Sequence, residues 1–223
     1  EGYEKLAELD WDGYRARYGN ISRLDRVLEA EDDDVNAYRV SKQADALMLF
    51  YVLSNDEVRD LFERLGYQLS DDDIRRTVNY YMARTSHGST LSRLVHSWIL
   101  ARSNRAEAME FFDDVLRSDI NDIQGGTTPE GIHLGAMAGS IDLLQRCFTG
   151  LETRGNRLIL RPHWPDSLGA LDFAMFYRGH RLRLRVSGKE VQVTAAAGAQ
   201  PPIEIECRGH VEQLSPGGIV RLG

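Results

Sequence analysis

The stretch "HRLRLRVSGKEVQV", residues 180–193, alternates apolar and polar side chains on both sides of a Ser187–Gly188 pair. A period of two is typical of a strand with one buried face, and a serine–glycine pair between two such runs indicates a hairpin turn. Other short runs of this kind follow Arg154, separated by glycine, proline and asparagine. The C-terminal third of the chain is therefore predicted to be an antiparallel β-region.

Upstream of this β-region the pattern becomes helical. The segment 38–54, "YRVSKQADALMLFYVLS", is apolar on nearly every side after its first five residues, which predicts a buried helix. Ser54 or Asn55 is the expected N-cap of the next helix, and Gly66 is its expected end. Ser70 is the expected N-cap of a third helix, which begins with three acidic residues.

The order of these elements predicts the fold class. A run of helices followed by a run of strands is α+β by segregation, or two separate domains. The change falls between residues 150 and 156, so the expected domains are 1–150, helical, and 151–223, an antiparallel β-domain. Residues 1–37 are acidic and aromatic and are predicted to form loops and short turns.

Composition limits the function. The formal net charge of −7 argues against a general nucleic-acid or anionic-membrane binder, and no apolar run approaches the roughly 20 residues of a membrane helix. No signal peptide is visible at the start. Cys147 and Cys207 are the only cysteines, which favours the reducing cytoplasm over a disulfide framework. The chain lacks an initiator methionine, and we expect it to be a piece of a longer protein.

The first stretch with possible chemistry is Lys42–Gln43. Lys42 and Asp45 are the only charged residues between Val40 and Leu53. The simple interpretation is an ion pair three residues apart at a helix entrance, worth a few tenths of a kcal/mol. The alternative is that Lys42 faces an anionic or hydroxyl-rich partner, because an unpaired buried lysine costs several kcal/mol.

The second stretch is "TSHGSTLS", residues 85–92, which opens an apolar helical pattern. It offers several hydroxyls and the ring of His87, and Gly88 allows a close approach to the backbone. The free N–H groups of a helix start attract an anion. An ordinary N-cap with additional serines explains the same composition and stays open as the alternative.

The third stretch is "GGTTPEGIHLGAMAG", residues 125–139. Thr128 is the expected N-cap of a helix with Pro129 at its first position and Glu130 in its first turn. His133 is expected one turn into that helix, either as a core histidine or as a ligand-binding group.

Gly131, Gly135 and Gly139 recur every four residues in the same predicted helix. Each costs about 1 kcal/mol relative to alanine, so something must approach this face closely. A neighbouring helix is the simplest candidate, and a ligand is the next. If the two glycine-containing helix starts meet in space, they would bind phosphate well.

These motifs together carry a resemblance that spans nearly the whole chain. The chain resembles the C-terminal part of glycoside hydrolase family 65, inverting disaccharide phosphorylases that act on trehalose, maltose, kojibiose and similar α-glucosides. Residues 1–11 resemble the segment after the family's catalytic region, and residues 40–53 resemble its Lys-Gln-Ala-Asp helix. Residues 85–92 resemble its His-x-Ser-Ser-Leu-Ser loop, and residues 125–139 resemble its Thr-Thr-x-Glu-Gly-Ile-His segment.

The resemblance implies the later helices of an (α/α)6 barrel followed by the family's C-terminal β-domain. It also implies that inorganic phosphate, a co-substrate, attacks the anomeric carbon while a glutamic acid protonates the leaving oxygen. No cofactor or metal is expected. The residues that match the family's phosphate site are Gly88, Ser89, Thr90 and His133. Lys42 and Gln43 match the pair that grips the glucosyl unit.

Two departures limit what the resemblance implies. Thr90 stands where the family usually has serine, although the hydroxyl is kept. The general acid is expected upstream of residue 1, so this chain alone should be inactive without the N-terminal part of the same protein, and a homodimer stays open. The alternatives are a hydrolase of the acid trehalase type, in which Glu130 would activate water, and a non-catalytic carbohydrate-binding or interaction fragment.

Overall fold

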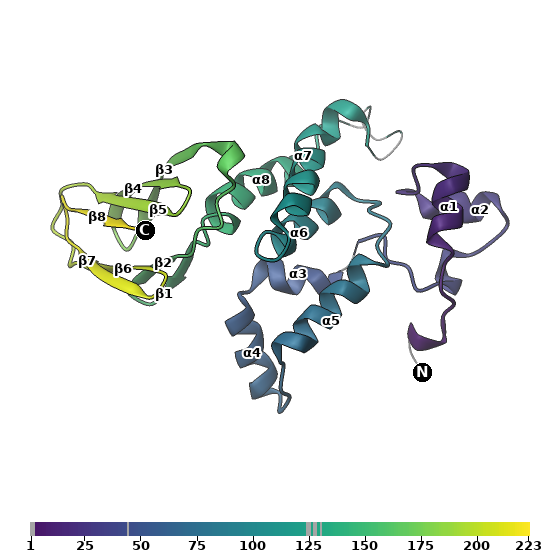
Figure 1. Ribbon diagram of the computed structural model, residues 1–223, viewed down its shortest axis with the longest axis horizontal. Helices are drawn as coiled ribbons and strands as arrows, with labels where there is room; N and C mark the ends of the chain where they lie inside the picture. Colours follow the sequence, from purple (N-terminus) through teal and green to yellow (C-terminus); the bar gives the residue numbers. More distant parts are fainter. Residues whose placement is uncertain (1–2, 44, 124–125, 127–128, 130) are drawn as a thin grey trace. The chain divides into compact units, whose positions relative to one another are not determined.

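The structure is a computed structural model that describes residues 3–43, 45–123, 126, 129 and 131–223. The chain divides into two compact units, Glu1–Ser140 and Ile141–Gly223. The first unit is helical and the second contains the strands (Figure 1). The predicted order of helices followed by strands is confirmed, and the fold is a mixture of helices and mainly antiparallel sheets.

The helical unit is built from eight α-helices and two short 3₁₀ turns within its described residues. The helices are α1 (Trp11–Tyr18), α2 (Leu24–Ala30), α3 (Asp45–Val52), α4 (Asn55–Arg64), α5 (Asp71–Met82), α6 (Thr90–Leu100), α7 (Arg105–Asn121) and α8 (Leu134–Asp142). The 3₁₀ turns are Tyr3–Lys5 and Val35–Ala37. No helix in the described ranges is long and apolar enough to cross a membrane.

The prediction that residues 1–37 form only loops and turns is wrong, because α1 and α2 lie there. The side chain of Asp10 caps α1 by accepting a hydrogen bond from the backbone N–H of Gly13. Leu24 and Leu28 of α2 are buried and pack with Leu9. A local cap and a small apolar cluster therefore order a segment whose acidic composition suggested irregular structure.

The predicted caps of α4 and α5 are confirmed. Ser54 and Glu57 form a reciprocal capping box at the start of α4, and Ser70 and Asp73 form a second one at the start of α5. In each box a hydroxyl accepts from the N3 backbone N–H while the carboxylate accepts from the N-cap N–H. Gly66 follows α4 with a φ of +82°, a conformation that glycine adopts readily.

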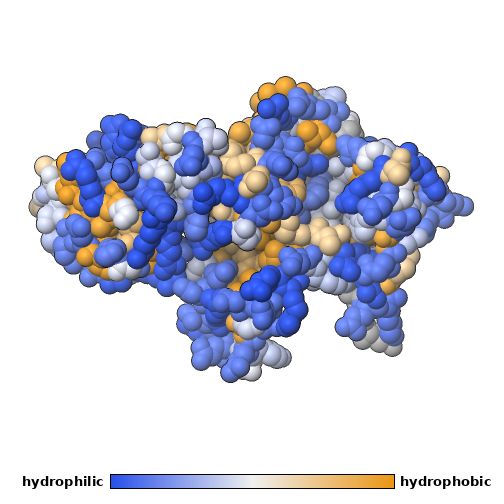
Figure 2. Space-filling view, in the orientation of Figure 1, coloured by the Kyte–Doolittle hydropathy of each residue, from blue (hydrophilic) through white to orange (hydrophobic). Residues whose placement is uncertain are grey.

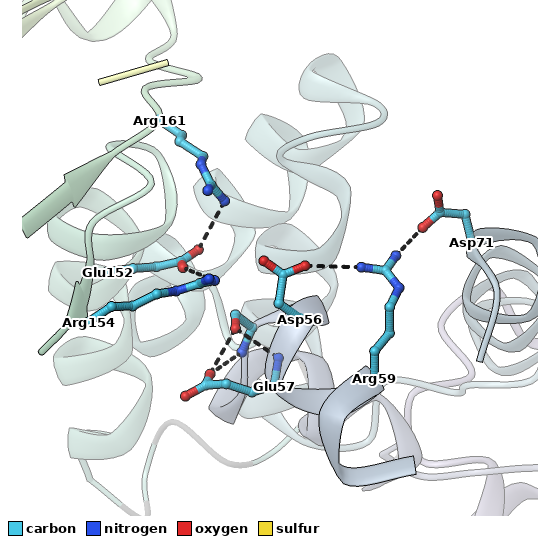
Figure 3. Close-up of polar contacts among 8 residues, drawn as sticks. Asp56, Glu57, Arg59, Asp71, Glu152, Arg154 and Arg161 are labelled. Atoms are coloured by element: carbon cyan, nitrogen blue, oxygen red, sulfur yellow. Dashed lines mark hydrogen bonds and ion pairs between the residues drawn. The ribbon is translucent and has the colours of Figure 1, made fainter. Parts of the chain in front are cut away.

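Ion pairs link the two helices that these caps begin. Arg59 of α4 pairs with Asp56 in its own helix, at 3.2 Å, and with Asp71 at the start of α5 (Figure 3). In the second unit, Arg154 pairs with Glu152 at 3.0 Å, and Figure 3 draws the two side chains facing each other. Each pair has at least one partner that is well exposed to solvent, so each contributes at most about 1 kcal/mol.

The prediction of a buried helix within residues 38–54 is only partly right. A helix forms, but it begins at Asp45, and Leu47 is its only fully buried residue. Leu47 packs with Val95 of α6, while Val52 is exposed. The other apolar residues of α3 are only partly covered, and the elements that α3 mainly contacts are α4, α5 and α6.

The second unit contains two four-stranded sheets. The strands are β1 (Glu152–Arg154), β2 (Arg157–Leu160), β3 (Ala170–Tyr177), β4 (His180–Ser187), β5 (Glu190–Ala195), β6 (Ile203–Cys207), β7 (His210–Leu214) and β8 (Ile219–Leu222). Their orders are β1-β2-β6-β7 and β3-β4-β5-β8. The buried residues of β4 alternate strictly with exposed ones, as the opening stretch predicted.

Two details of the β-region differ from the prediction. β2 pairs with β6 in parallel, with Leu158 opposite Ile205, so the region is not purely antiparallel. The intervening strands β3 to β5 form the other sheet, which allows β6 to return beside β2 in the same direction. The predicted hairpin forms between β4 and β5, but Ser187 pairs with Glu190, so Gly188 and Lys189 are the turn residues.

Candidate functional site

The segment of Lys42 lies directly beside the 85–88 loop. Ser86 donates its backbone N–H to the carbonyl of Ser41 at 2.9 Å, and Gly88 donates to the carbonyl of Lys42 at 3.0 Å. Ser41 also pairs with Thr85 in a short parallel bridge. Backbone hydrogen bonds thus join two predicted site segments more than forty residues apart in sequence.

Gly88 is required at this contact. A Cβ atom on Gly88 would lie 2.7 Å from Cγ of Lys42 and 2.7 Å from the carbonyl oxygen of Ser22. Both distances are far below an ordinary van der Waals contact. The absence of a side chain therefore lets the loop lie against the aliphatic part of Lys42.

Lys42 does not lie in a helix, contrary to the prediction. It is exposed and precedes α3, and no described carboxylate lies within ion-pair distance of its ammonium group. The expected pairing with Asp45 is absent, because Asp45 accepts a hydrogen bond from the amide of Gln43 at 3.2 Å. The helix-entrance ion pair is thus wrong for Lys42, and its ammonium group is available to a ligand.

A cavity of about 360 Å³ opens beside Lys42. Its polar lining comes from Lys42, Asp25, Asn36 and Ser86, and its apolar lining from Leu6, Leu24, Val35, Tyr38 and Val40. The guanidinium of Arg23 holds the pKa of the Asp25 carboxyl below its usual range, with a further contribution from Lys42. The cavity has the size and the mixed lining typical of a small-molecule site.

The start of α6 carries the predicted hydroxyl pair. Ser89 is the N-cap residue, but its side chain makes no capping hydrogen bond. Thr90 is buried at the first helical position, and neither hydroxyl bonds to a described residue. The simple interpretation of Ser89 as a helix cap is therefore not supported. A helix start leaves backbone N–H groups without a partner inside the helix, and of those in the first turn of α6, Ser92 donates to the carbonyl of Ser89 at 3.1 Å.

Arg93 of α6 holds the loop in place, and it is not among the site residues predicted from the sequence. Its guanidinium donates to the carbonyl of His87 at 3.1 Å and to the hydroxyl of Ser22 at 3.3 Å. It also pairs with Asp114 of α7 at 3.3 Å. Burial lowers the pKa of Arg93 below its usual range, with the nearby Asp114 acting in the opposite direction. An arginine that is mostly covered and has three partners is visible only in the tertiary structure.

His133 lies just before α8 rather than one turn into it, because α8 begins at Leu134. Its backbone N–H donates to Asp119 of α7 at 3.0 Å, and its ring Nδ1 bonds to the same carboxylate. The hydrogen bond from His133 lowers the pKa of Asp119. Pro129 also precedes α8, so the predicted helix start is wrong by several residues, and the predicted Thr128 and Glu130 lie outside the described residues.

The glycine face of α8 packs on α6. A Cβ atom on Gly135 would lie 3.4 Å from Leu91, and one on Gly139 would lie 2.5 Å from Leu94. The neighbouring helix predicted for this face is thus confirmed for these two glycines. Gly131 is different, because it has a φ of +111° and precedes the helix.

The contacts between α6 and α8 also fix the direction of the two helices. They advance along both helices in the same order, from Gly135 with Leu91 to Gly139 with Leu94. The two N-termini therefore lie at the same end of the contact, and so do their positive dipole ends. Two helix starts, unpaired hydroxyls and a nearby lysine form a region suited to an oxyanion. Within the described part of the chain, no group of acidic, histidine or cysteine side chains is arranged to hold a metal ion.

These features define an α+β protein with a candidate oxyanion site at two helix starts. Residues 1–142 match the central catalytic domain of glycosyl hydrolase family 65, and residues 151–214 match the C-terminal domain of that family. The chain belongs to glycosyl hydrolase family 65.

Several relatives show how much of a whole protein the chain represents. An uncharacterised glycosyl hydrolase of Mycobacterium tuberculosis strain H37Rv is 63% identical over all of this chain, which spans 17% of that protein. The trehalose 6-phosphate phosphorylase of Lactococcus lactis is 38% identical over 87% of this chain and 26% of that protein. The kojibiose phosphorylase of Escherichia coli is 25% identical over 94% of this chain and 25% of that protein.

A solved structure supports the fold. It is described as a kojibiose phosphorylase from the human microbiome, and it matches 100% of this chain and 30% of its own with a TM-score of 0.71 and 23% identity. The chain therefore spans less than a third of each of these relatives.

Proposed function

We propose that the chain is the phosphate-holding portion of an inverting α-glucoside phosphorylase, which cleaves a disaccharide with inorganic phosphate to give glucose 1-phosphate and a sugar. The observation that carries this proposal is the backbone pairing of residues 41–42 with residues 85–88, which sets Lys42 against Gly88. The names of the phosphorylase relatives support the same reaction class.

In this proposal phosphate binds at the start of α6. Ser89 and Thr90 donate their hydroxyl groups, since neither bonds to a described residue. His133 completes the phosphate site from the start of α8, with its ring oriented by Asp119. Hydrogen bonds to a charged acceptor are the stronger kind, so a few such donors suffice to hold a phosphate dianion. Gly88 contributes to this site by letting the loop lie against the side chain of Lys42.

The glucosyl unit binds beside Lys42 and Gln43 in this proposal. The adjoining cavity of about 360 Å³ and its mixed polar and apolar lining support a sugar at this position. We infer that the disaccharide is of the trehalose type. The support is that the trehalose 6-phosphate phosphorylase is 38% identical to this chain, compared with 25% for the kojibiose phosphorylase of Escherichia coli.

We also propose that the helices are the later part of an (α/α)6 barrel that the rest of the protein completes, supplying the general acid. The large share of each relative outside the matched region supports this. Apolar surface is also visible near the end of α7 (Figure 2), and exposed apolar residues there and at the start of α8 are Leu116, Ile120, Ile132 and Leu134. This chain by itself would then bind ligands without turnover. Its two free, buried cysteines fit a cytoplasmic location.

The test is product analysis with the full-length protein. Trehalose, trehalose 6-phosphate, maltose and kojibiose should be incubated with and without inorganic phosphate. Glucose 1-phosphate, or a glucose 1-phosphate that carries a second phosphate group, should form only when inorganic phosphate is present. Release of free glucose at the same rate without phosphate would instead establish the hydrolase of the acid trehalase type. Sugar binding without any cleavage by the full-length protein would establish the non-catalytic alternative.

A further inference from the structure

The tautomer of His87 follows from a buried hydroxyl. Ser92 lies in the first turn of α6 and is only 1% exposed, so its O–H needs an acceptor inside the protein. The acceptor in reach among the described residues is Nδ1 of His87, 3.0 Å from the Ser92 oxygen. Nδ1 therefore accepts, and a neutral His87 ring must carry its hydrogen on Nε2.

The surroundings of the ring keep it neutral. Burial, together with the nearby His96, Arg93 and Arg15, lowers the pKa of His87 to about 3. The rings of His96 and Phe111 lie 4.5 Å and 5.2 Å from it, centroid to centroid, and pack against it. His87 is thus locked in position with one N–H donor at physiological pH.

That donor has no acceptor among the described residues. The hydroxyl of Ser92 bonds to the other ring nitrogen, Nδ1, and no described oxygen bonds to Nε2. The backbone is also unusual, because His87 has a φ of +57°, a left-handed conformation that costs about 1 kcal/mol or more for a residue with a side chain. Backbone strain of this kind concentrates at functional sites, and Arg93 maintains it by binding the His87 carbonyl.

We infer that His87 is a further ligand of the oxyanion at the start of α6 and donates its Nε2–H to a phosphate oxygen. This inference rests on the proposed phosphate site and extends it, since the family resemblance assigned no role to His87. His87 precedes Gly88 and the hydroxyl pair Ser89–Thr90, so one loop would supply a ring N–H, two hydroxyls and the helix N–H groups. The cationic Arg93 and Arg15 around the ring add a favourable field for the anion.

His96 provides the matched control. It is 1% exposed, belongs to the same aromatic cluster, and neither of its ring nitrogens has a hydrogen-bond partner among the described residues. Replacing His96 with phenylalanine removes an imidazole and keeps the packing against His87 and Phe111. Replacing His87 with phenylalanine removes the proposed donor and keeps a ring in the cluster. His87→Asn keeps an N–H donor on a residue type that tolerates positive φ.

The experiment measures the affinity of inorganic phosphate for the full-length protein and these variants by titration calorimetry, with thermal midpoints recorded alongside. His87→Phe should raise the dissociation constant on the order of tenfold or more, because a hydrogen bond to a charged group is lost. His87→Asn should raise the dissociation constant of phosphate by less than this. His96→Phe should bind phosphate as the wild type does. Equal phosphate affinity in all folded variants would overturn the inference.

The tautomer gives a second measurement that does not depend on any variant. Nitrogen-15 histidine spectra of the wild-type protein should show His87 with its hydrogen on Nε2, and that N–H signal should shift when phosphate is added. A hydrogen on Nδ1 would contradict the inference even if phosphate binds. The proposed function fails separately, when disaccharide cleavage proceeds without phosphate, so the two failures are distinguishable.

Discussion

Replacing Gly88 with alanine tests the contact between the Lys42 segment and the 85–88 loop. The new Cβ would lie 2.7 Å from the carbonyl oxygen of Ser22 and 2.7 Å from Cγ of Lys42. An ordinary contact needs roughly 3.5 Å or more, so one side must move by the better part of an ångström. Ser22 cannot move easily, because its N–H donates to Asn20 at 2.9 Å and its hydroxyl accepts from Arg93 at 3.3 Å.

The displacement therefore falls on Lys42 and on the loop itself. Overpacking of this kind costs about 1 to 3 kcal/mol, and the loss should appear in urea unfolding followed by the helical circular dichroism signal. In the full-length protein, the same variant should raise KM for the disaccharide and for phosphate together, because Lys42 and the start of α6 both shift. Each KM is expected to rise about tenfold for every 1.4 kcal/mol of binding free energy that is lost.

Gly135→Ala is the matched control. Its Cβ would lie 3.4 Å from Leu91, an ordinary contact, and Gly135 lies in the first turn of α8. Alanine is the better helix former by about 1 kcal/mol, so this variant should be as stable as the wild type or more stable. If Gly88→Ala unfolds at the same urea concentration as Gly135→Ala and leaves both KM values unchanged, the close approach of Lys42 to the loop is wrong.

Three further predictions concern the candidate site. Ser89→Ala combined with Thr90→Val should raise the phosphate KM on the order of a hundredfold in the full-length enzyme and leave the thermal midpoint nearly unchanged, since Ser89 makes no capping bond; a lowered midpoint with a flat phosphate response would identify a simple helix cap. Lys42→Met should weaken disaccharide binding more than phosphate binding in the same initial-rate assay, and the opposite order would exclude a sugar role for this lysine. The bond from His133 lowers the pKa of Asp119 below its ordinary value of 3.8, so the Asp119 carboxylate contributes stability above that value and loses it as pH falls through the lowered pKa. Asp119→Asn should therefore flatten the fall of the thermal midpoint below about pH 4. A midpoint that falls as steeply in this variant as in the wild type would argue against the Asp119–His133 pair.

Local sequence determined the helix starts that depend on a few neighbouring residues. Ser54 with Glu57 and Ser70 with Asp73 form capping boxes that are complete within four residues of chain. The alternation in residues 180–193 likewise determined a hairpin with one buried face. These features are predictable because their hydrogen-bond partners and their periodicity lie within one short window.

The helix starts at the candidate site were predicted less well, and for a physical reason. Lys42 stays outside α3 because its carbonyl accepts from Gly88, a partner 46 positions away along the chain. His133 precedes α8 because both its backbone N–H and its ring bond to Asp119 of α7. In each case a distant hydrogen-bond partner outweighs a helix propensity of well under 1 kcal/mol per residue.

The sequence by itself determined which residue types and motifs are present: a glycine, two hydroxyls, a lysine and two histidines at predicted helix starts, with a resemblance that named their family. Only the tertiary structure decided which of them meet. The parallel pairing of Ser41 with Thr85 and the packing of Gly139 on Leu94 join segments far apart along the chain. The tautomer of His87 likewise depends on a buried hydroxyl one helical turn away. Such contacts follow from packing and desolvation, because burial leaves each polar group only the partners that the fold places within reach.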